Sequence, residues 1–144
     1  MAERPDLARA AFRWLLIAVY LPFGLFHILK PGSFLPIMPS WVPFPREVIA
    51  LTGAAEVLGA LGLMIPRLRY AAGIGLALYA VGVFPANLHH ALDGVTVPGL
   101  PSSWWYHAPR LAFQPVFVWW ALWAGGVLDP PLHLRRAPSL SETT

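Results

Sequence analysis

The chain has 144 residues, of which 57% are hydrophobic, 13% aromatic and only 12% charged. This composition, with a mean hydropathy of +0.58, excludes an ordinary soluble domain and predicts a small protein built from membrane-spanning helices. Because the sequence contains no cysteine, disulfides, iron–sulfur clusters and thiol redox chemistry by this chain are excluded as well.

The first predicted transmembrane helix covers residues 12–29. At about 1.5 Å per residue, this run is long enough to cross the hydrocarbon core of a bilayer. It is longer than the apolar core of a signal peptide, and Lys30-Pro31 follows it in place of a small-residue cleavage site. We therefore expect this helix to be retained.

Residues 30–46 form a loop that combines five prolines with aromatic side chains such as Trp41 and Phe44. Prolines restrict the backbone and break helices, whereas aromatic side chains favour the membrane interface. The loop is therefore predicted to be stiff and ordered. It either lies on the membrane interface or folds over the helices as a cap.

The second and third predicted helices cover residues 48–65 and 70–91. The connection between them begins with Pro66 and is so short that the two helices must be antiparallel neighbours. Small residues recur at four-residue spacing, which lets helices pack closely in lipid. These pairs are Ala55/Gly59, Ala71/Gly75 and Gly82/Ala86.

The second helix carries Glu56 near its middle, and a carboxylate at that depth is costly unless it has a function or a partner. Its neighbours at helical spacing are Thr52, Gly53, Gly59 and Ala60. These small residues form a face that another helix or a ligand can approach closely.

Residues 92–108 are predicted to be a second ordered outer loop, with an interfacial aromatic cluster at 104–106. The fourth helix is predicted to cover residues 110–128, and residues 133–144 form a polar C-terminal tail. Residues 1–132 are therefore expected to be a single transmembrane domain.

With four spans, both ends of the chain lie on the same side of the membrane. Seven basic residues then lie on that side, namely Arg4, Arg9, Arg13, Arg67, Arg69, Arg135 and Arg136, and three on the other, namely Lys30, Arg46 and Arg110. This excess predicts that both termini are cytoplasmic. The predicted fold is thus all-α: an antiparallel four-helix bundle that crosses the cytoplasmic membrane several times.

The basic residues also bear on possible partners. The sequence pI is about 9.8, but the Lys and Arg residues are spread between the apolar segments instead of forming one patch. The lipid bilayer is therefore the expected partner, and nucleic acid is not.

This topology gathers the polar intramembrane residues in the outer half of the bundle, with Glu56 deepest. Arg110 and Gln114 are four residues apart and share a helix face. We therefore expect Arg110 to approach Glu56 directly, or through His27 or water.

Two interpretations of this cluster are open. In the first, the polar residues only satisfy one another and fix the helix register, because unpaired polar groups are costly in lipid. In the second, they form the polar end of a pocket for a small amphipathic molecule, capped by the two outer loops. Glu56 and His27 would then handle protons. The predicted ligand-binding residues are Asn87, His90, Arg110, Gln114 and Trp120.

Four histidines lie toward the outer side, a pattern that also invites a metal or haem interpretation. However, the adjacent His89 and His90 point to different faces of a helix, and no two histidines on one helix have the four-residue spacing of paired ligands. No metal site is therefore predicted.

At these motifs the sequence resembles the DoxX-like family of small four-helix membrane proteins. Four segments match in order along nearly the whole chain: Gly24-Leu25-Phe26-His27 with its proline-rich loop, Thr52-Gly53 with Glu56, Phe84-Pro85-Ala86-Asn87, and Arg110 with Gln114 and Trp120. The sequence departs from the family pattern at Ile28, where an aromatic residue is usual, at His89, where an apolar residue is typical, and at Ala112, where a proline is common.

The resemblance implies the four-helix fold. Some relatives are linked to quinone-coupled oxidation of sulfur compounds or to membrane oxidoreductase complexes, so it also implies a redox role with a quinone as the candidate cofactor. We therefore expect the chain to bind a small hydrophobic ligand of the quinone type, and to work with a membrane or soluble redox partner.

Two other function classes stay open at this stage. One is a scaffold or assembly partner of another membrane complex, and the other is an acid–base enzyme that acts on a lipid-like substrate. The sequence also leaves open whether copies of the chain associate and whether the chain is itself an enzyme.

Overall fold

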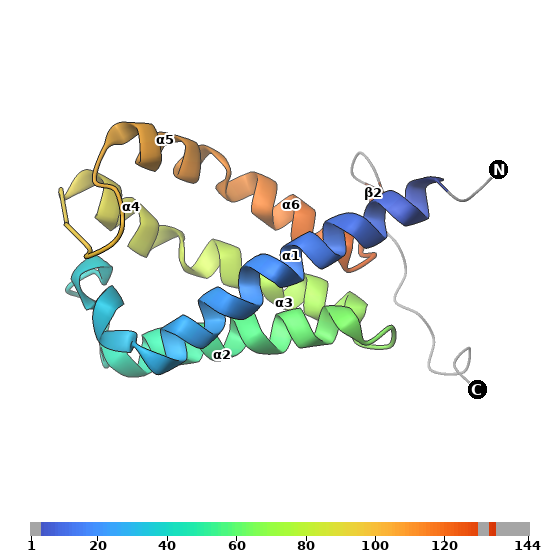
Figure 1. Ribbon diagram of the computed structural model, residues 1–144, viewed down its shortest axis with the longest axis horizontal. Helices are drawn as coiled ribbons and strands as arrows, with labels where there is room; N and C mark the ends of the chain where they lie inside the picture. Colours follow the sequence, from blue (N-terminus) through green and yellow to red (C-terminus); the bar gives the residue numbers. More distant parts are fainter. Residues whose placement is uncertain (1–3, 130–132, 135–144) are drawn as a thin grey trace.

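The fold is described from a computed structural model, which covers residues 4–129 and 133–134 (Figure 1). These residues form six α-helices, one 3-10 helix and two short strands. In chain order they are α1 (Arg4–Leu29), the 3-10 helix η1 (Pro31–Ile37), α2 (Pro45–Met64), α3 (Arg69–Gly82), α4 (Phe84–Leu92), α5 (Trp104–Ala112), α6 (Gln114–Ala124), β1 (Leu128–Asp129) and β2 (His133–Leu134).

Three helical segments are long and apolar enough to cross a membrane: Leu7–Leu29, Pro45–Met64 and Arg69–Leu92. Their outward faces carry large hydrophobic side chains, including Leu51 and Leu58 on α2 and Leu78 on α3, which are about 70% exposed. Such faces are expected where the surrounding solvent is lipid. The chain is therefore a mainly helical membrane protein.

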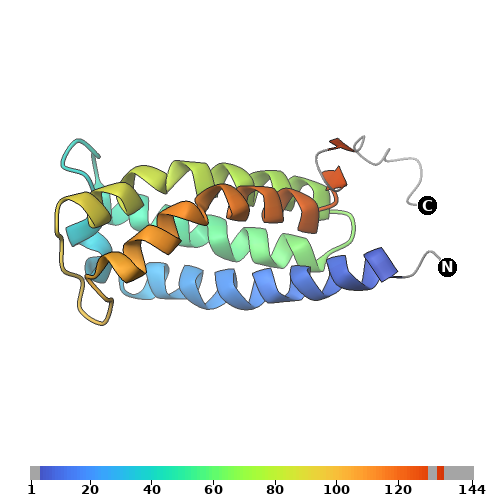
Figure 2. The same ribbon diagram turned by 90° about the horizontal axis from the view of Figure 1, so that it is seen from above.

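The helices lie side by side along the long axis of the molecule (Figure 2). α2 packs against both α1 and α3, and α3 packs against α6. The predicted short connection between the second and third helices is present at residues 65–68, and α2 and α3 are antiparallel neighbours as expected.

Two predicted helices are each interrupted near a proline. The third is divided at Val83 into α3 and α4, and the fourth is divided at Phe113 into α5 and α6. Each interruption lies two residues before a proline, Pro85 or Pro115, which lacks the N–H that a continuous helix requires. Val83 and Phe113 keep right-handed helical dihedral angles, so the chain continues in nearly the same direction.

The fourth predicted helix, residues 110–128, had wrong boundaries at both ends. α5 already begins at Trp104, so the aromatic cluster at 104–106 is helical and not part of a loop. α6 ends at Ala124, and Leu128 belongs to strand β1. The chain turns at Gly126, whose positive φ of 77° favours glycine.

The short strands modify the predicted domain boundary. His133, assigned to the tail, pairs with Asp129 across the two-stranded ladder. This hairpin is fastened to α1, because Arg9 donates a hydrogen bond of 2.5 Å to Asp129. Residues 135–144 of the predicted tail lie outside the described residues.

The proline-rich loop is ordered, as predicted. Its first part forms η1, whose side chains Phe34 and Ile37 are buried. η1 contacts α1, α2 and α4, so this segment folds over the helices as a cap.

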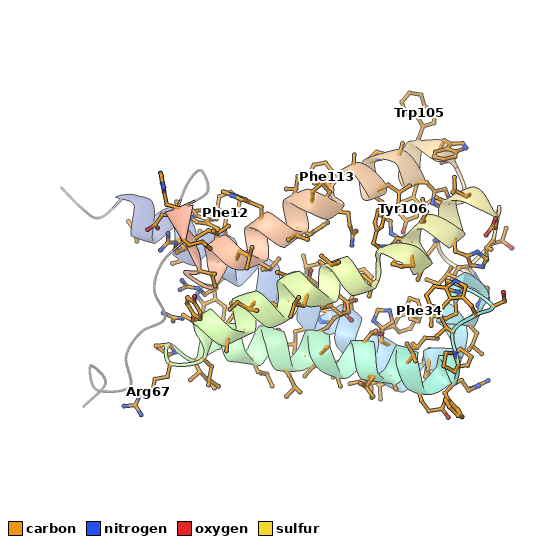
Figure 3. The ribbon with its side chains drawn as sticks, turned by 180° about the vertical axis from the view of Figure 1, so that it is seen from behind. Phe12, Phe34, Arg67, Trp105, Tyr106 and Phe113 are labelled. Atoms are coloured by element: carbon orange, nitrogen blue, oxygen red, sulfur yellow. The ribbon has the colours of Figure 1, made fainter. Side chains whose placement is uncertain are left out.

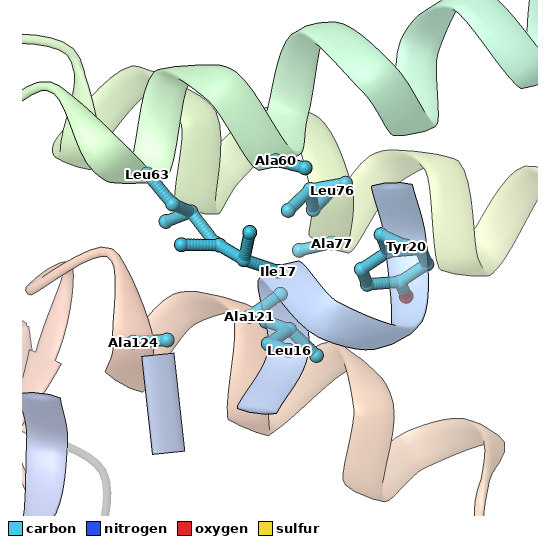
Figure 4. Close-up of a cluster of buried hydrophobic side chains, with 9 residues drawn as sticks. All are labelled: Leu16, Ile17, Tyr20, Ala60, Leu63, Leu76, Ala77, Ala121 and Ala124. Carbon is cyan, nitrogen blue, oxygen red and sulfur yellow. The ribbon is translucent and has the colours of Figure 1, made fainter. Parts of the chain in front are cut away.

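Two clusters of buried side chains hold the helices together. One lies toward the end of the molecule where α1 begins, and Figure 4 shows its side chains converging from α1, α2, α3 and α6. The other lies beneath the cap and contains Phe34, Ile37, Ile49 and Val97. The first cluster consists of Leu16, Ile17, Tyr20, Ala60, Leu63, Leu76, Ala77, Ala121 and Ala124.

Glycines allow three close helix contacts. A Cβ atom placed on Gly53 would lie 2.7 Å from the carbonyl oxygen of Gly24, so α1 and α2 touch backbone to backbone. Gly73 and Gly125 make a similar contact after α6, and Gly59 packs against Leu76.

The predicted close packing was wrong for two other glycines. A Cβ atom on Gly75 or on Gly82 would meet nothing within 4 Å, because Gly75 lines a hollow between α2 and α3 and Gly82 lines the central cavity. The four-residue spacing identified small residues but not the side of the helix that packs.

The contact between α1 and α2 can be tested with a pair of alanine substitutions. Gly53→Ala should lower the free energy of unfolding by about 1–3 kcal/mol, because its methyl group would overlap the backbone of α1. Gly75→Ala, in open space, should stabilise the helix by up to about 1 kcal/mol. Thermal unfolding in mild detergent measures both, and equal effects of the two substitutions would contradict the assigned contact.

Candidate ligand-binding cavity

A cavity of about 790 Å³ lies between the two buried clusters. Tyr20 from the first cluster and Phe34 from the second both line it. Figure 3 shows Phe34 and Tyr106 lying between the helices, whereas Trp105 projects away from them. The proline-rich loop and residues 97–100 close the cavity at the capped end, so segments of both predicted loops line it.

Glu56 is the centre of one polar group in the cavity wall. The residue is only 3% exposed, and each carboxyl oxygen has its own partner. His27 Nδ1 lies 2.6 Å from Oε2, and the Tyr79 hydroxyl donates a hydrogen bond of 2.7 Å to Oε1. Helices α1, α2 and α3 thus meet at one carboxyl group.

The close contact of Gly24 with Gly53 makes this arrangement possible. Gly24 lies three residues before His27, and Gly53 lies three residues before Glu56, so each pair is neighbouring on one helix face. A larger residue at either glycine would separate the helices and lengthen the contact between His27 and Glu56.

A second polar group is a chain of hydrogen bonds that runs from α5 to α3. Arg110 Nη2 donates to the side-chain oxygen of Asn87, and Asn87 donates to Gln114 Oε1 at 3.2 Å. Gln114 then donates to the backbone carbonyl of Ala80 at 2.5 Å. Ala80 lies in the last turn of α3, where carbonyl groups lack the full set of helical partners.

The two polar groups do not pair as the sequence predicted. Arg110 was expected to approach Glu56 directly, or through His27 or water, but its direct hydrogen bonds go to Asn87 and His90 on α4. Because α5 packs against α4, Arg110 lies next to Asn87 and His90 and hydrogen-bonds to them instead of to Glu56 on α2. Both groups nevertheless line the same cavity.

Five of the seven predicted site residues therefore converge on the cavity wall: His27, Glu56, Asn87, Arg110 and Gln114. His90 lies behind Arg110 and does not line the cavity. Trp120 lies elsewhere, because its indole N–H donates to the Phe12 carbonyl at 3.1 Å and its ring packs on Phe12 and Phe117. A role for Trp120 in binding the cavity ligand does not fit this position.

His90 and His107 form a buried pair beside the second polar group, with ring centroids 4.7 Å apart. Arg110 can only donate hydrogen bonds, so His90 Nδ1 must accept from it and the proton of the neutral ring lies on Nε2. Among the described residues, His90 Nε2 and His107 Nδ1 have no hydrogen-bond partner. His90 therefore holds Arg110 on the side away from the cavity, and His107 packs against His90.

Two tyrosines belong to the site although the sequence analysis missed them. Tyr79 bonds to Glu56, and Tyr20 lines the cavity with its ring edge against the Tyr79 ring. The tight turn between α2 and α3 could have identified Tyr79 from the sequence. Residues at similar distances from an antiparallel turn face each other, and Glu56 lies nine residues before position 65 while Tyr79 lies eleven after position 68.

Residues 16–125 match the family described as Domain of unknown function (DUF8561). The chain belongs to this family. No curated protein and no solved structure matches the chain. The part that matches DUF8561 includes the polar side chains of both groups and ends just after α6.

The hydrogen-bond chain of this DUF8561 protein can be tested at Gln114. Gln114→Glu should lower the free energy of unfolding by about 1–3 kcal/mol at neutral pH, because a carboxylate oxygen would then face the Ala80 carbonyl. In acid the protonated carboxyl group can donate to Ala80, so the difference from the wild type should shrink. Thermal unfolding at the two pH values measures this, and a difference independent of pH would contradict the assigned chain.

Proposed function

We propose that this protein binds a small hydrophobic ligand of the quinone type as part of a membrane redox system. The observation that carries the proposal is the cavity of about 790 Å³, because two separate sets of polar side chains reach an otherwise apolar wall. Sites for small molecules commonly combine an apolar lining with a few placed polar groups.

The proposal includes a membrane topology. In it, α1, α2, α3 with α4, and α5 with α6 are the four spans of an antiparallel four-helix bundle in the cytoplasmic membrane. The cavity then opens in the outer half, and both termini are cytoplasmic. The distribution of basic residues and the continuous path of each interrupted helix support this topology.

A quinone suits the chemistry of the two polar groups. Its ring is apolar, and its carbonyl oxygens accept hydrogen bonds. Arg110 has donors in the second group, and His27 Nε2 donates when Glu56 carries the proton of the contact at Nδ1. An apolar ring held between these groups would be oriented by hydrogen bonds at both ends.

Glu56 is the proposed group for proton exchange, with His27 as its partner. Either the imidazole or the carboxyl group can carry the proton of their 2.6 Å contact. Reduction of a quinone to a quinol consumes two electrons and two protons. A proton-carrying pair in the wall would deliver the protons. The electrons would come from a redox partner.

The resemblance to the DoxX-like family, on which the redox assignment depends, stays a prediction. The scaffold and the acid–base enzyme are the alternatives. Mass spectrometry of the protein purified in mild detergent distinguishes quinone binding from the scaffold. A co-purified quinone supports the proposal, and a stoichiometric protein partner without a bound ligand supports the scaffold. Modification of a co-purified lipid that depends on Glu56 would support the enzyme.

Binding can be measured directly because Trp41 lines the cavity and its fluorescence should be quenched by a bound quinone. Arg110→Gln should raise the Kd of a short-tailed benzoquinone about tenfold, the loss of one charged hydrogen bond. Trp120→Phe is the matched control, since Trp120 lies away from the cavity, and should leave the Kd unchanged. Equal Kd values for the wild type and Arg110→Gln would contradict a ligand at this wall.

Proton exchange by Glu56 can be tested without removing its hydrogen bonds. In Glu56→Gln the amide oxygen can still accept from Tyr79 and the amide N–H can donate to His27, so the unfolding temperature should stay close to that of the wild type. Quinone-dependent turnover in native membranes should fall about tenfold or more. Wild-type turnover in this folded variant would exclude a proton role.

A further inference from the structure

A second hollow lies on the lipid-facing side of α2 and α3, outside the cavity, with a volume of about 720 Å³. One face of each helix lines it, with residues at helical spacings of three and four. On α2 these are Val48, Leu51, Thr52 and Ala55, and on α3 they are Gly75, Leu78 and Tyr79. Pro43, Phe44 and Glu47 line the hollow at the start of α2, so its only charged lining residue among those described lies at that end. We call this hollow the α2–α3 groove.

Small residues leave the space that forms the α2–α3 groove. Gly75 has no neighbour within 4 Å of the place where a Cβ atom would lie, and Ala55 faces the same hollow from α2. The flanking Leu51 and Leu78 are about 70% exposed, so the groove opens to the hydrocarbon of the bilayer along segments that are apolar enough to cross it.

The α2–α3 groove and the central cavity share part of their lining. Val48, Thr52 and Tyr79 line both, so these three side chains separate the two spaces. Tyr79 is also the residue whose hydroxyl bonds to Glu56. The groove therefore reaches the cavity next to the first polar group.

The polar atoms at this boundary are already satisfied. The Thr52 hydroxyl donates to the Ile49 carbonyl at 2.7 Å, and the Tyr79 hydroxyl donates to Glu56 at 2.7 Å. The boundary thus offers methyl groups and an aromatic ring to a passing molecule. These surfaces suit a hydrocarbon chain, whereas a polar head group or an ion would lose its hydration without compensation.

We propose that the ligand of the cavity carries a hydrocarbon chain, which leaves between α2 and α3 at Val48, Thr52 and Tyr79 and lies in the α2–α3 groove. This inference rests on the proposed function and names the ligand class more closely: a lipid-tailed quinone. Because the groove is no more apolar than lipid, it adds little affinity. Its role is to let the head group reach the buried polar side chains while the chain stays in contact with the bilayer.

The wild-type protein in lipid nanodiscs allows a first test. The probe is a fully substituted benzoquinone with an isoprenoid tail that bears a photoreactive diazirine beyond the first isoprene unit, where the proposed path places the chain outside the cavity. Irradiation should give adducts on groove residues such as Leu51 and Leu78, which an excess of the unmodified long-tailed quinone suppresses. Suppressible adducts on Phe23 or Phe117, which line the cavity at α1 and α6, would overturn the proposed path.

A pair of variants on α3 provides a second test. Gly75→Phe places a ring in the groove, starting from a position where a Cβ atom meets nothing within 4 Å, and should weaken binding of the long-tailed quinone about tenfold while leaving a tail-less quinone unaffected. Val81→Phe is the control, because Val81 is exposed and lines neither space, and it should bind both quinones as the wild type does. Unchanged binding of the long-tailed quinone by Gly75→Phe would overturn the groove assignment.

Binding of the tail-less quinone distinguishes failure of the proposed function from failure of the groove assignment. If the wild type binds neither quinone, the proposed function fails and the groove assignment fails with it. If the wild type binds the tail-less quinone, and Gly75→Phe binds each quinone as tightly as the wild type does, only the path of the chain is overturned.

Discussion

The arrangement of this protein depends on one buried carboxyl group that has to be satisfied inside an apolar helix bundle. An isolated carboxylate in such surroundings is costly. Glu56 is satisfied by His27 from α1 and by Tyr79 from α3, each at a separate oxygen. Three helices are thereby held in one register, and the contact of Gly24 with Gly53 brings the first two close enough.

The prolines give the second constraint. Pro85 and Pro115 interrupt their helices at Val83 and Phe113, and the interrupted halves continue at the same end of the molecule, where the cap also lies. The backbone near these breaks offers the Ala80 carbonyl to Gln114. Space and polar side chains therefore occur together in this half, whereas the other half is filled by the first buried cluster.

The division of the polar side chains into two groups has a chemical consequence. A direct ion pair of Arg110 with Glu56 would have filled the space between them and left a purely structural contact. Instead each residue is satisfied on its own side, by Asn87 and His90 in one case and by His27 and Tyr79 in the other. The wall between them remains apolar, which is why the site suits an uncharged ring with hydrogen-bond acceptors.

Much of the site could be predicted from residue types, because polar residues in apolar helices are rare and conspicuous. His27, Glu56, Asn87, Arg110 and Gln114 were found in this way, and all five line the cavity. Tyr79 was missed because a tyrosine in an apolar helix is not unusual, and only the register of α2 with α3 shows that it faces Glu56. Trp120 was included because it matches the DoxX-like pattern of the fourth helix, but its indole N–H donates to the Phe12 carbonyl, away from the cavity.

The sequence by itself determined that the chain is a helical membrane protein, where its apolar segments lie, and that α2 and α3 are antiparallel neighbours. These properties follow from composition, segment length and a four-residue connection, which are local. Only the tertiary structure decided which polar side chains pair, which glycines lie at helix contacts and where space remains. Those properties depend on the rotation of each helix about its axis, which is set when all the side chains pack together and not by any one segment.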